Sequence, residues 1–230
     1  MTRIATRGLA LTGLLLLSTT SATQAQFLGF GGDRQNPSLN ITPAEIAIDV
    51  PMPVSSANLA LLLAQAGEGG DLSGIKEAAL RKYRLHLAIA LNARLREFFA
   101  DEEIPLAEQG GLLSLHNRLE IKAVKHFNDL QSLEGVELER GTVELGGKFY
   151  YRLSGFNGRT LRERSLDIAE WKISEKYQVK SAGNGSTVED TTEESIKLAL
   201  SAVVEKILDE VEDELDAGEL RDLLSTSSNK

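Results

Sequence analysis

The sequence predicts an α+β domain in which a mostly antiparallel sheet, one N-terminal strand plus a three-stranded meander, carries two long helices on one face. Apolar and polar residues alternate from Val136 to Val179, which is typical of strands. Residues 74–100 and 192–215 instead repeat apolar residues at three- and four-residue steps, as amphipathic helices do. Because strands and helices follow one another in blocks, the helices are expected to cover one side of the sheet.

The first expected element is a strand from Glu45 to Val50, in which apolar residues alternate before Pro51 ends it. A short apolar helix with the sequence NLALLLAQA should follow, capped by Ser55 or Ser56 and ended by glycines. Leucines lie on all sides of this helix, which favours its burial.

A long helix is expected from Gly74 to Ala100, with Ser73 as its N-cap. It is locally basic in an acidic chain, and so many charges exclude a membrane span. Its apolar positions include Ala78, Leu85, Ile89 and Phe99, and its basic positions are Lys76, Arg81, Lys82, Arg84, Arg94 and Arg96.

The next segment is ambiguous. A proline and two glycines mark residues 101–111 as a turn region. In residues 112–133, the spacing of Leu115 and Leu119 fits a helix, whereas the alternation of Leu119 and Ile121 also fits a strand. We choose the helix as the expectation.

Residues 136–179 predict an antiparallel meander of at least three strands. Two dipeptides suit two-residue hairpin turns, whose type I′ geometry needs positive φ: Gly146-Gly147 and Asn157-Gly158. Along the third strand the apolar positions change phase by one residue, which predicts a bulge near Ala169.

The last expected element is a helix from Thr192 to Leu215, and Thr191 and Glu194 have the spacing of a capping box before it. Its apolar stripe consists of Ile196, Leu200, Val203, Val204, Ile207, Val211 and Leu215. The opposite side is acidic, which opposes the helix dipole near the carboxyl end. We therefore expect the basic helix 74–100 to lie beside it on the same face of the sheet.

The amino terminus predicts export. Residues 1–25 have the three parts of a cleavable signal peptide: Arg3 and Arg7, an apolar run at 9–17, and small residues before a mature start at Gln26. The apolar run has about half the ~20 residues needed to span a bilayer. The expected division is a signal peptide at 1–25, a flexible segment at 26–42, one α/β domain at 43–224 and a disordered tail at 225–230.

Composition indicates the cellular compartment and the class of partner. The chain has no cysteine, so a disulfide or an acylated cysteine anchor is not expected, and an exported domain without disulfides favours a bacterial periplasm. Removal of the signal peptide takes two arginines from a chain with 25 basic and 34 acidic residues, so the mature net charge is about −11. Such a charge repels nucleic acid. The expected protein is periplasmic or secreted, with no transmembrane span and no lipid anchor.

No catalytic or cofactor motif stands out. The sequence contains neither a G-x-S-x-G nucleophile elbow nor a glycine-rich phosphate loop. His116 and Glu120 would share a helix face, but one pair is too few for a zinc site. The acidic stretch from Asp209 lacks the ligand spacing of an EF-hand loop. We therefore expect no catalytic, cofactor-binding or metal-ligating residue.

The expected function is a non-enzymatic accessory or assembly factor of the cell envelope, acting through protein–protein contacts. The alternative is a carrier of a small apolar ligand such as a lipid, suggested by leucines at 59–63 and 112–115, and a hydrolase built from scattered carboxylates comes third. The order of elements resembles small accessory proteins of the bacterial envelope, including lipopolysaccharide-assembly and secretion auxiliaries. The candidate interaction residues are Tyr150, Arg152 and Arg164 on the meander and Asp209, Glu212, Asp213 and Asp216 on the last helix.

Overall fold

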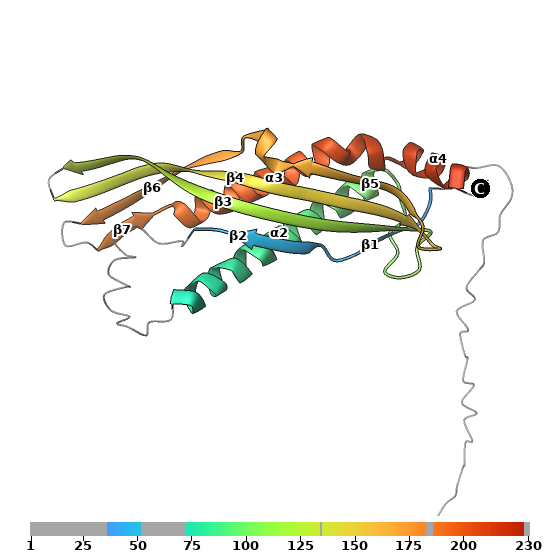
Figure 1. Ribbon diagram of the computed structural model, residues 1–230, viewed down its shortest axis with the longest axis horizontal. Coiled ribbons are helices and arrows are strands. Elements are labelled where there is room, and N and C mark those ends of the chain that lie inside the picture. The colour runs from blue at the N-terminus through green and yellow to red at the C-terminus, as the bar shows by residue number, and fades with distance from the viewer. Residues whose placement is uncertain (1–35, 52–71, 134, 183–185, 228–230) are drawn as a thin grey trace, which may run out of the picture. The chain divides into compact units, whose positions relative to one another are not determined.

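The computed structural model describes residues 36–51, 72–133, 135–182 and 186–227. These residues form a mixed α/β fold with one curled sheet of seven strands (Figure 1). The strands are β1 (Leu39–Ile41), β2 (Glu45–Asp49), β3 (Leu113–Leu133), β4 (Val136–Gly155), β5 (Thr160–Asp167), β6 (Ser174–Ala182) and β7 (Thr187–Asp190). The described α-helices are α2 (Leu72–Asp101), α3 (Thr192–Leu215) and α4 (Ala217–Ser227). The expected signal peptide and the expected helix after Ser55 or Ser56 lie outside the described residues.

The centre of the sheet is a long antiparallel hairpin formed by β3 and β4. β5 and β6 pair antiparallel with successive parts of β4, and β7 pairs with β6. β1 and β2 pair with the other side of β3, but in parallel, so the sheet is mixed rather than a simple meander. β1 lies in the segment 26–42 that the sequence assigns to a flexible region, yet Leu39 is completely buried and its N–H donates to the Pro105 carbonyl at 2.9 Å.

The helix expected at 112–133 is wrong, because this segment is the strand β3. The four-residue spacing of Leu115 and Leu119 places them on one face of a strand as well as one face of a helix, since four is a multiple of the strand period of two. In the structure both are fully buried, and so are alternate neighbours along β3. Pairing with β4 along nearly all of β3 stabilises the strand.

The Gly146-Gly147 hairpin turn is also wrong, because both glycines lie within β4, opposite Lys122 and Ile121 of β3. Gly147 has φ +133°, and a Cβ there would lie 2.0 Å from the carbonyl oxygen of Glu120. Glycine is needed at this position for the close approach of two strands and not for a turn.

The second glycine dipeptide does lie in a turn, between β4 and β5. Gly158 has φ +76°, while Asn157 is not among the described residues with positive φ. The N–H of Gly158 donates to the Gly155 carbonyl, and the N–H of Gly155 donates to the Arg159 carbonyl, each at 2.9 Å. This pattern is a three-residue loop in which a β-turn is followed by a left-handed glycine, in place of a type I′ turn.

The predicted change of phase near Ala169 is present, but a 3₁₀ turn, η2 (Ile168–Trp171), replaces the expected bulge. The Asp167 carboxylate caps it by accepting from the Ala169 N–H at 2.9 Å, and Lys172 leaves it with φ +52°. β5, η2 and β6 thus act as one interrupted third strand alongside β4.

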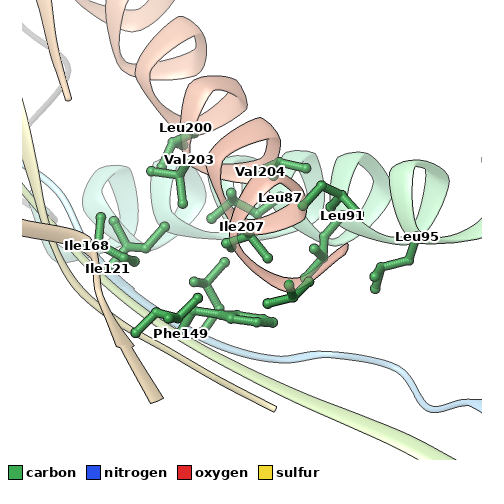
Figure 2. Packing of buried hydrophobic residues seen from close by; sticks show 14 of the residues in the cluster. Leu87, Leu91, Leu95, Ile121, Phe149, Ile168, Leu200, Val203, Val204 and Ile207 are labelled. Atoms are coloured by element: carbon green, nitrogen blue, oxygen red, sulfur yellow. The ribbon is translucent and has the colours of Figure 1, made fainter. Parts of the chain in front are cut away.

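The two long helices lie side by side over the same face of the sheet, as predicted, and together with alternate strand residues they bury one apolar core (Figure 2). The bridging contacts are Lys82–Glu193 at 2.6 Å, His86–Ser201 at 3.1 Å and Arg94–Glu205 at 2.8 Å. Residue numbers rise together in these pairs, so α2 and α3 run in the same direction. No helix in the described ranges is long and apolar enough to cross a membrane.

The predicted apolar stripe is right for α3 and partly wrong for α2. Every predicted stripe residue of α3 is buried. In α2, however, Leu85 and Ile89 are 60% and 62% exposed. The core positions of α2 are Leu80, Tyr83, Leu87, Leu91, Leu95 and Phe99.

The start of α3 is where the sequence places it, but the capping box does not form. The Thr191 hydroxyl accepts from the Gln178 N–H at 2.9 Å, and the Asp190 carboxylate instead accepts from the Thr192 N–H at 2.9 Å. The helix α4, which the sequence analysis did not predict, begins after Asp216 and continues into the expected tail at 225–230.

Candidate functional site

The face of the sheet opposite the helices is polar and carries a groove of about 390 Å³, the open-face groove. Tyr150 and Arg152 both line it, so the structure brings these two predicted residues together. The Tyr150 hydroxyl donates to Glu163 at 2.7 Å, and this hydrogen bond raises the pKa of Tyr150. Cationic and anionic side chains alternate here across the strands, as on many solvated sheet faces.

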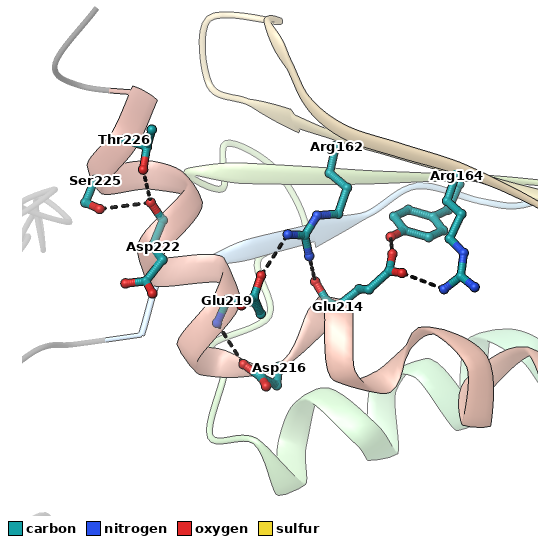
Figure 3. A network of polar contacts seen from close by, with 9 residues as sticks. Arg162, Arg164, Glu214, Asp216, Glu219, Asp222, Ser225 and Thr226 are labelled. Carbon is teal, nitrogen blue, oxygen red and sulfur yellow. Dashed lines mark hydrogen bonds and ion pairs between the residues drawn. The ribbon is translucent and has the colours of Figure 1, made fainter.

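Arg164 lies on the other face of the sheet. It is opposite Tyr151 in the strand register, and its guanidinium reaches α3, where it donates to the Glu210 carbonyl at 2.8 Å and pairs with the Glu214 carboxylate at 2.5 Å. Figure 3 shows the contact between Arg164 and Glu214. Arg164 therefore does not share a surface with Tyr150 and Arg152.

The contacts of Arg164 belong to a network that joins β4 and β5 to the end of α3 (Figure 3). The Tyr151 hydroxyl donates to Glu214, and Arg162 donates to the Glu214 carbonyl and pairs with Glu219 at 2.7 Å. Burial, followed by the hydrogen bond to Glu214, raises the pKa of Tyr151. The network holds the junction of α3 and α4 against the sheet, so its charges already have partners within the chain.

The four predicted acidic interaction residues have different surroundings. Asp209 pairs with Lys206 on its own helix at 2.9 Å, and Asp216 caps α4 by accepting from the Glu219 N–H at 2.7 Å. Glu212 and Asp213 are exposed, and neither has an ion-pair partner within the described part of the chain. Only these last two are free for an outside partner.

The predicted His116–Glu120 pair is separated because β3 is a strand. Four strand residues span about 13 Å, too far for two side chains to bind one metal ion. His116 instead lies 3.2 Å from the Thr42 hydroxyl through its Nδ1. Within the described ranges, no group of three or more histidine, aspartate or glutamate side chains is arranged to hold a metal.

A second concave surface, the distal groove, was missed by the sequence analysis. It lies between the distal half of the β3–β4 hairpin, β6 and the first turns of α3, and has a volume of about 580 Å³. Its lining includes Asn128, Arg140, Gly141, Tyr177, Ser195 and Leu198.

The floor of the distal groove is held by buried polar contacts around Tyr177. The ring lies so close to Gly141 that a Cβ there would be 2.4 Å from it. Its hydroxyl donates to Glu139 at 3.0 Å, and the Lys125 ammonium lies 4.2 Å from the ring centroid and 3.0 Å from Glu139. Burial raises the pKa of Tyr177. The Tyr177 ring is therefore held in place by contacts within the chain.

Three large apolar side chains are exposed on the same side of the sheet as this floor, and one of them, Leu198, lines the groove. Phe127 is 61% exposed, and Leu130 and Leu198 are more than half exposed. Phe127 lies opposite Gly141 in the register and Leu130 opposite Glu139, which places both on the groove side of the hairpin. Grouped exposed apolar residues around a concavity are typical of interaction surfaces.

The outer edge of β3 adds unpaired backbone to this surface. β2 pairs with β3 only as far as Lys122, and no other described strand pairs with that edge from Ala123 to Leu133. An edge strand presents free N–H and C=O groups to an incoming strand. The sequence did contain a signal, because Phe127 and Leu130 are apolar residues within a polar stretch. The expectation of a helix at 112–133 meant that no strand edge was predicted there.

No protein-family model matches the sequence, and neither does any of the curated proteins compared with it. A neuraminyllactose-binding hemagglutinin homolog from Helicobacter pylori is similar in structure, with a TM-score of 0.45 at 10% identity over 89% of this chain and 96% of that one. A minor lipoprotein from Acinetobacter baumannii gives 0.29 at 10% identity over 78% and 94%, and a lipoprotein from Neisseria meningitidis gives 0.18 at 14% over 75% and 99%. Because all three TM-scores are below 0.5, these likenesses assign neither a fold family nor a function.

Proposed function

We propose that this chain is an exported, non-enzymatic accessory or assembly factor of a bacterial envelope that binds another protein through the distal groove. The signal-peptide pattern at 1–25 and the lack of cysteine support export to a periplasm. The observation that carries the binding role is the conjunction of a preformed concave floor, three exposed apolar side chains and a strand edge with which no described strand pairs.

The partner is expected to contribute an extended segment. Its backbone would pair with the free edge of β3 from Ala123 onward, as in β-strand addition, while alternate apolar side chains contact Phe127 and Leu130. Main-chain hydrogen bonds would provide affinity, and the groove beside Leu198 would select the side chains.

Site-specific photo-crosslinking tests this proposal in cells of the native host. A benzophenone amino acid replaces Phe127 in the full chain, and the matched control carries it at Phe156, which is 80% exposed in the β4–β5 loop at the opposite end of the sheet. Phe127 lies opposite Gly141, and the fifteen residues from Gly141 to Phe156 separate the two positions by roughly 50 Å.

We expect a discrete protein adduct at position 127 and none at 156. Leu130→Ser and Leu198→Ser should weaken that adduct, since each removes apolar area beside the groove, whereas Phe156→Ser should leave it unchanged. Equal adducts at both positions, or adducts with lipid alone at position 127, would refute the proposal.

A further inference from the structure

A third concavity lies between α2 and the connection from β1 to β2. This α2 groove has a volume of about 370 Å³, at the lower end of the range for small-molecule sites. Its walls are apolar: Ile41, Pro43 and Ala44 lie on one side and Ala88, Ile89 and Leu95 on the other. Ile89 is the large apolar side chain that α2 leaves 62% exposed.

Asn117 of β3 is the polar residue that lines this groove from the sheet. Strand alternation places its side chain on the helix side, between the buried side chains of Leu115 and Leu119. It is 4% exposed, and neither its amide nitrogen nor its amide oxygen has a hydrogen-bond partner among the residues that the structure describes. Buried amides are nearly always bonded, so an unpaired donor and acceptor side by side call for a partner group.

The other polar side chains of the groove already have partners. The Thr42 hydroxyl donates to the Leu115 carbonyl at 3.0 Å, and Arg96 donates to the Asn92 amide oxygen at 3.2 Å. Asn117 therefore sets the hydrogen-bonding chemistry that an occupant must satisfy. That occupant must offer one acceptor and one donor on neighbouring atoms, next to an apolar body.

We propose that the α2 groove is a binding site for a small uncharged amphiphile, whose apolar chain lies against Ile89 and Pro43 and whose carboxamide or protonated carboxyl pairs with the Asn117 amide. Because both amide atoms are buried in the unliganded protein, the Asn117 side chain must turn toward the groove before the two hydrogen bonds form, one in each direction. The walls contribute affinity by burying the chain, and Asn117 selects the polar end.

This site differs from the carrier suggested by leucines in the sequence. Residues 59–63 lie outside the described part of the chain, and Leu113 and Leu115 are fully buried in the core. It is also independent of the distal groove. Residue 117 is ten positions from Phe127 along β3, roughly 33 Å, so either proposal can fail without the other.

Calorimetric titration of the purified chain with two eight-carbon probes tests the site. Octanamide can both donate and accept, whereas methyl octanoate can only accept. We expect octanamide to bind about 10- to 100-fold more tightly, and Asn117→Leu to abolish this preference. Asn117→Leu should also raise the melting temperature of the unliganded protein, since it replaces two unpaired polar atoms with an apolar group of similar size.

Two surface variants keep the test independent of any change in the core. Ile89→Ser removes an apolar wall and should weaken both probes several-fold, while Leu85→Ser, at a similarly exposed position of α2 outside the groove lining, should change neither. Equal affinity for the two probes, a preference that survives Asn117→Leu, or no heat of binding up to the solubility limit would each overturn the proposal.

Discussion

Adjacent glycines in β4 should respond in opposite ways to the same substitution. Gly147 has φ +133°, and an added Cβ would lie 2.0 Å from the Glu120 carbonyl oxygen of β3. At Gly146 the backbone is not in that region, and the nearest atom to an added Cβ is the Ala169 Cβ, at 3.7 Å. We expect Gly147→Ala to disrupt the long hairpin and Gly146→Ala to be tolerated.

The magnitude follows from two separate costs. Holding a residue with a Cβ at this φ costs about 1–3 kcal/mol, and moving a packed backbone to relieve the contact costs about 1–3 kcal/mol more. Alanine recovers about 0.5–1 kcal/mol relative to glycine within a strand. The net loss for Gly147→Ala is therefore about 1–5 kcal/mol, which can be a large part of the stability of a typical domain. Gly146→Ala should change stability by less than about 1 kcal/mol, in either direction.

Guanidinium unfolding monitored by the fluorescence of Trp171, the single tryptophan, measures both variants. With a slope of roughly 2–6 kcal/mol per molar, Gly147→Ala should lower the midpoint by about 0.2–2.5 M. If the two substitutions lower the midpoint equally, the strand assignment is refuted, because a type I′ turn at these positions would need positive φ at both.

Three further predictions follow from the turn, the leader and the helix contact. Gly158→Val should destabilise the protein by about 1–3 kcal/mol, because φ is +76° there, and Asn157→Val should destabilise it clearly less. If the two substitutions lower the melting temperature equally, the loop is a type I′ turn as the sequence predicts. Amino-terminal sequencing of the periplasmic protein should begin at or near Gln26, and an uncleaved chain in the cytoplasm would contradict export. The Lys197 ammonium lowers the pKa of Glu193, so this carboxylate stabilises the fold above pH 4.5 and less as pH falls through the lowered pKa. Glu193→Gln should therefore cost ~0.2–1 kcal/mol at pH 7, and a melting-temperature difference that persists at pH 2 would contradict this origin.

Features set by neighbouring residues were predictable from the sequence. The apolar stripe from Ile196 to Leu215 repeats for several turns, and all of its predicted members are buried in α3. The alternation around Tyr150 and Arg152 likewise predicted a polar sheet face, and both residues line the open-face groove. In both cases the pattern is strong enough for local periodicity to decide which side faces the core.

Features set by distant residues were not predictable. Whether residues 112–133 form a helix or a strand depends on β4, which pairs with this segment along its length. The sequence itself does not reveal that pairing. The role of Gly147 depends on one carbonyl of β3, which no local motif reveals. Where one spacing of apolar residues fits both a helix and a strand, only the tertiary contacts of the segment decide between them.

The prediction that Arg164 shares a surface with Tyr150 is a different kind of error, because the sequence did contain a signal against it. Leu166 is apolar, and alternation places Arg164, two residues earlier, on the same side of the strand. That side is covered by α3, so Arg164 meets Glu210 and Glu214 rather than Tyr150. An arginine on the apolar side of a strand indicates a partner carboxylate on the covering element, and here the acidic flank of α3 provides it.

The length of β3 explains how one strand contributes to two unlike surfaces. Its first half is covered by α2 and bordered by β1 and β2, so the unpaired amide of Asn117 is buried beside a small apolar groove. Its second half extends past both neighbouring strands, so Phe127 stays exposed beside a backbone edge with which no described strand pairs. Sites this far apart with no shared contacts respond to substitution additively. Any coupling between ligand and protein binding would therefore require a movement of β3 itself, and the Tyr177 contacts on its distal half oppose such a movement.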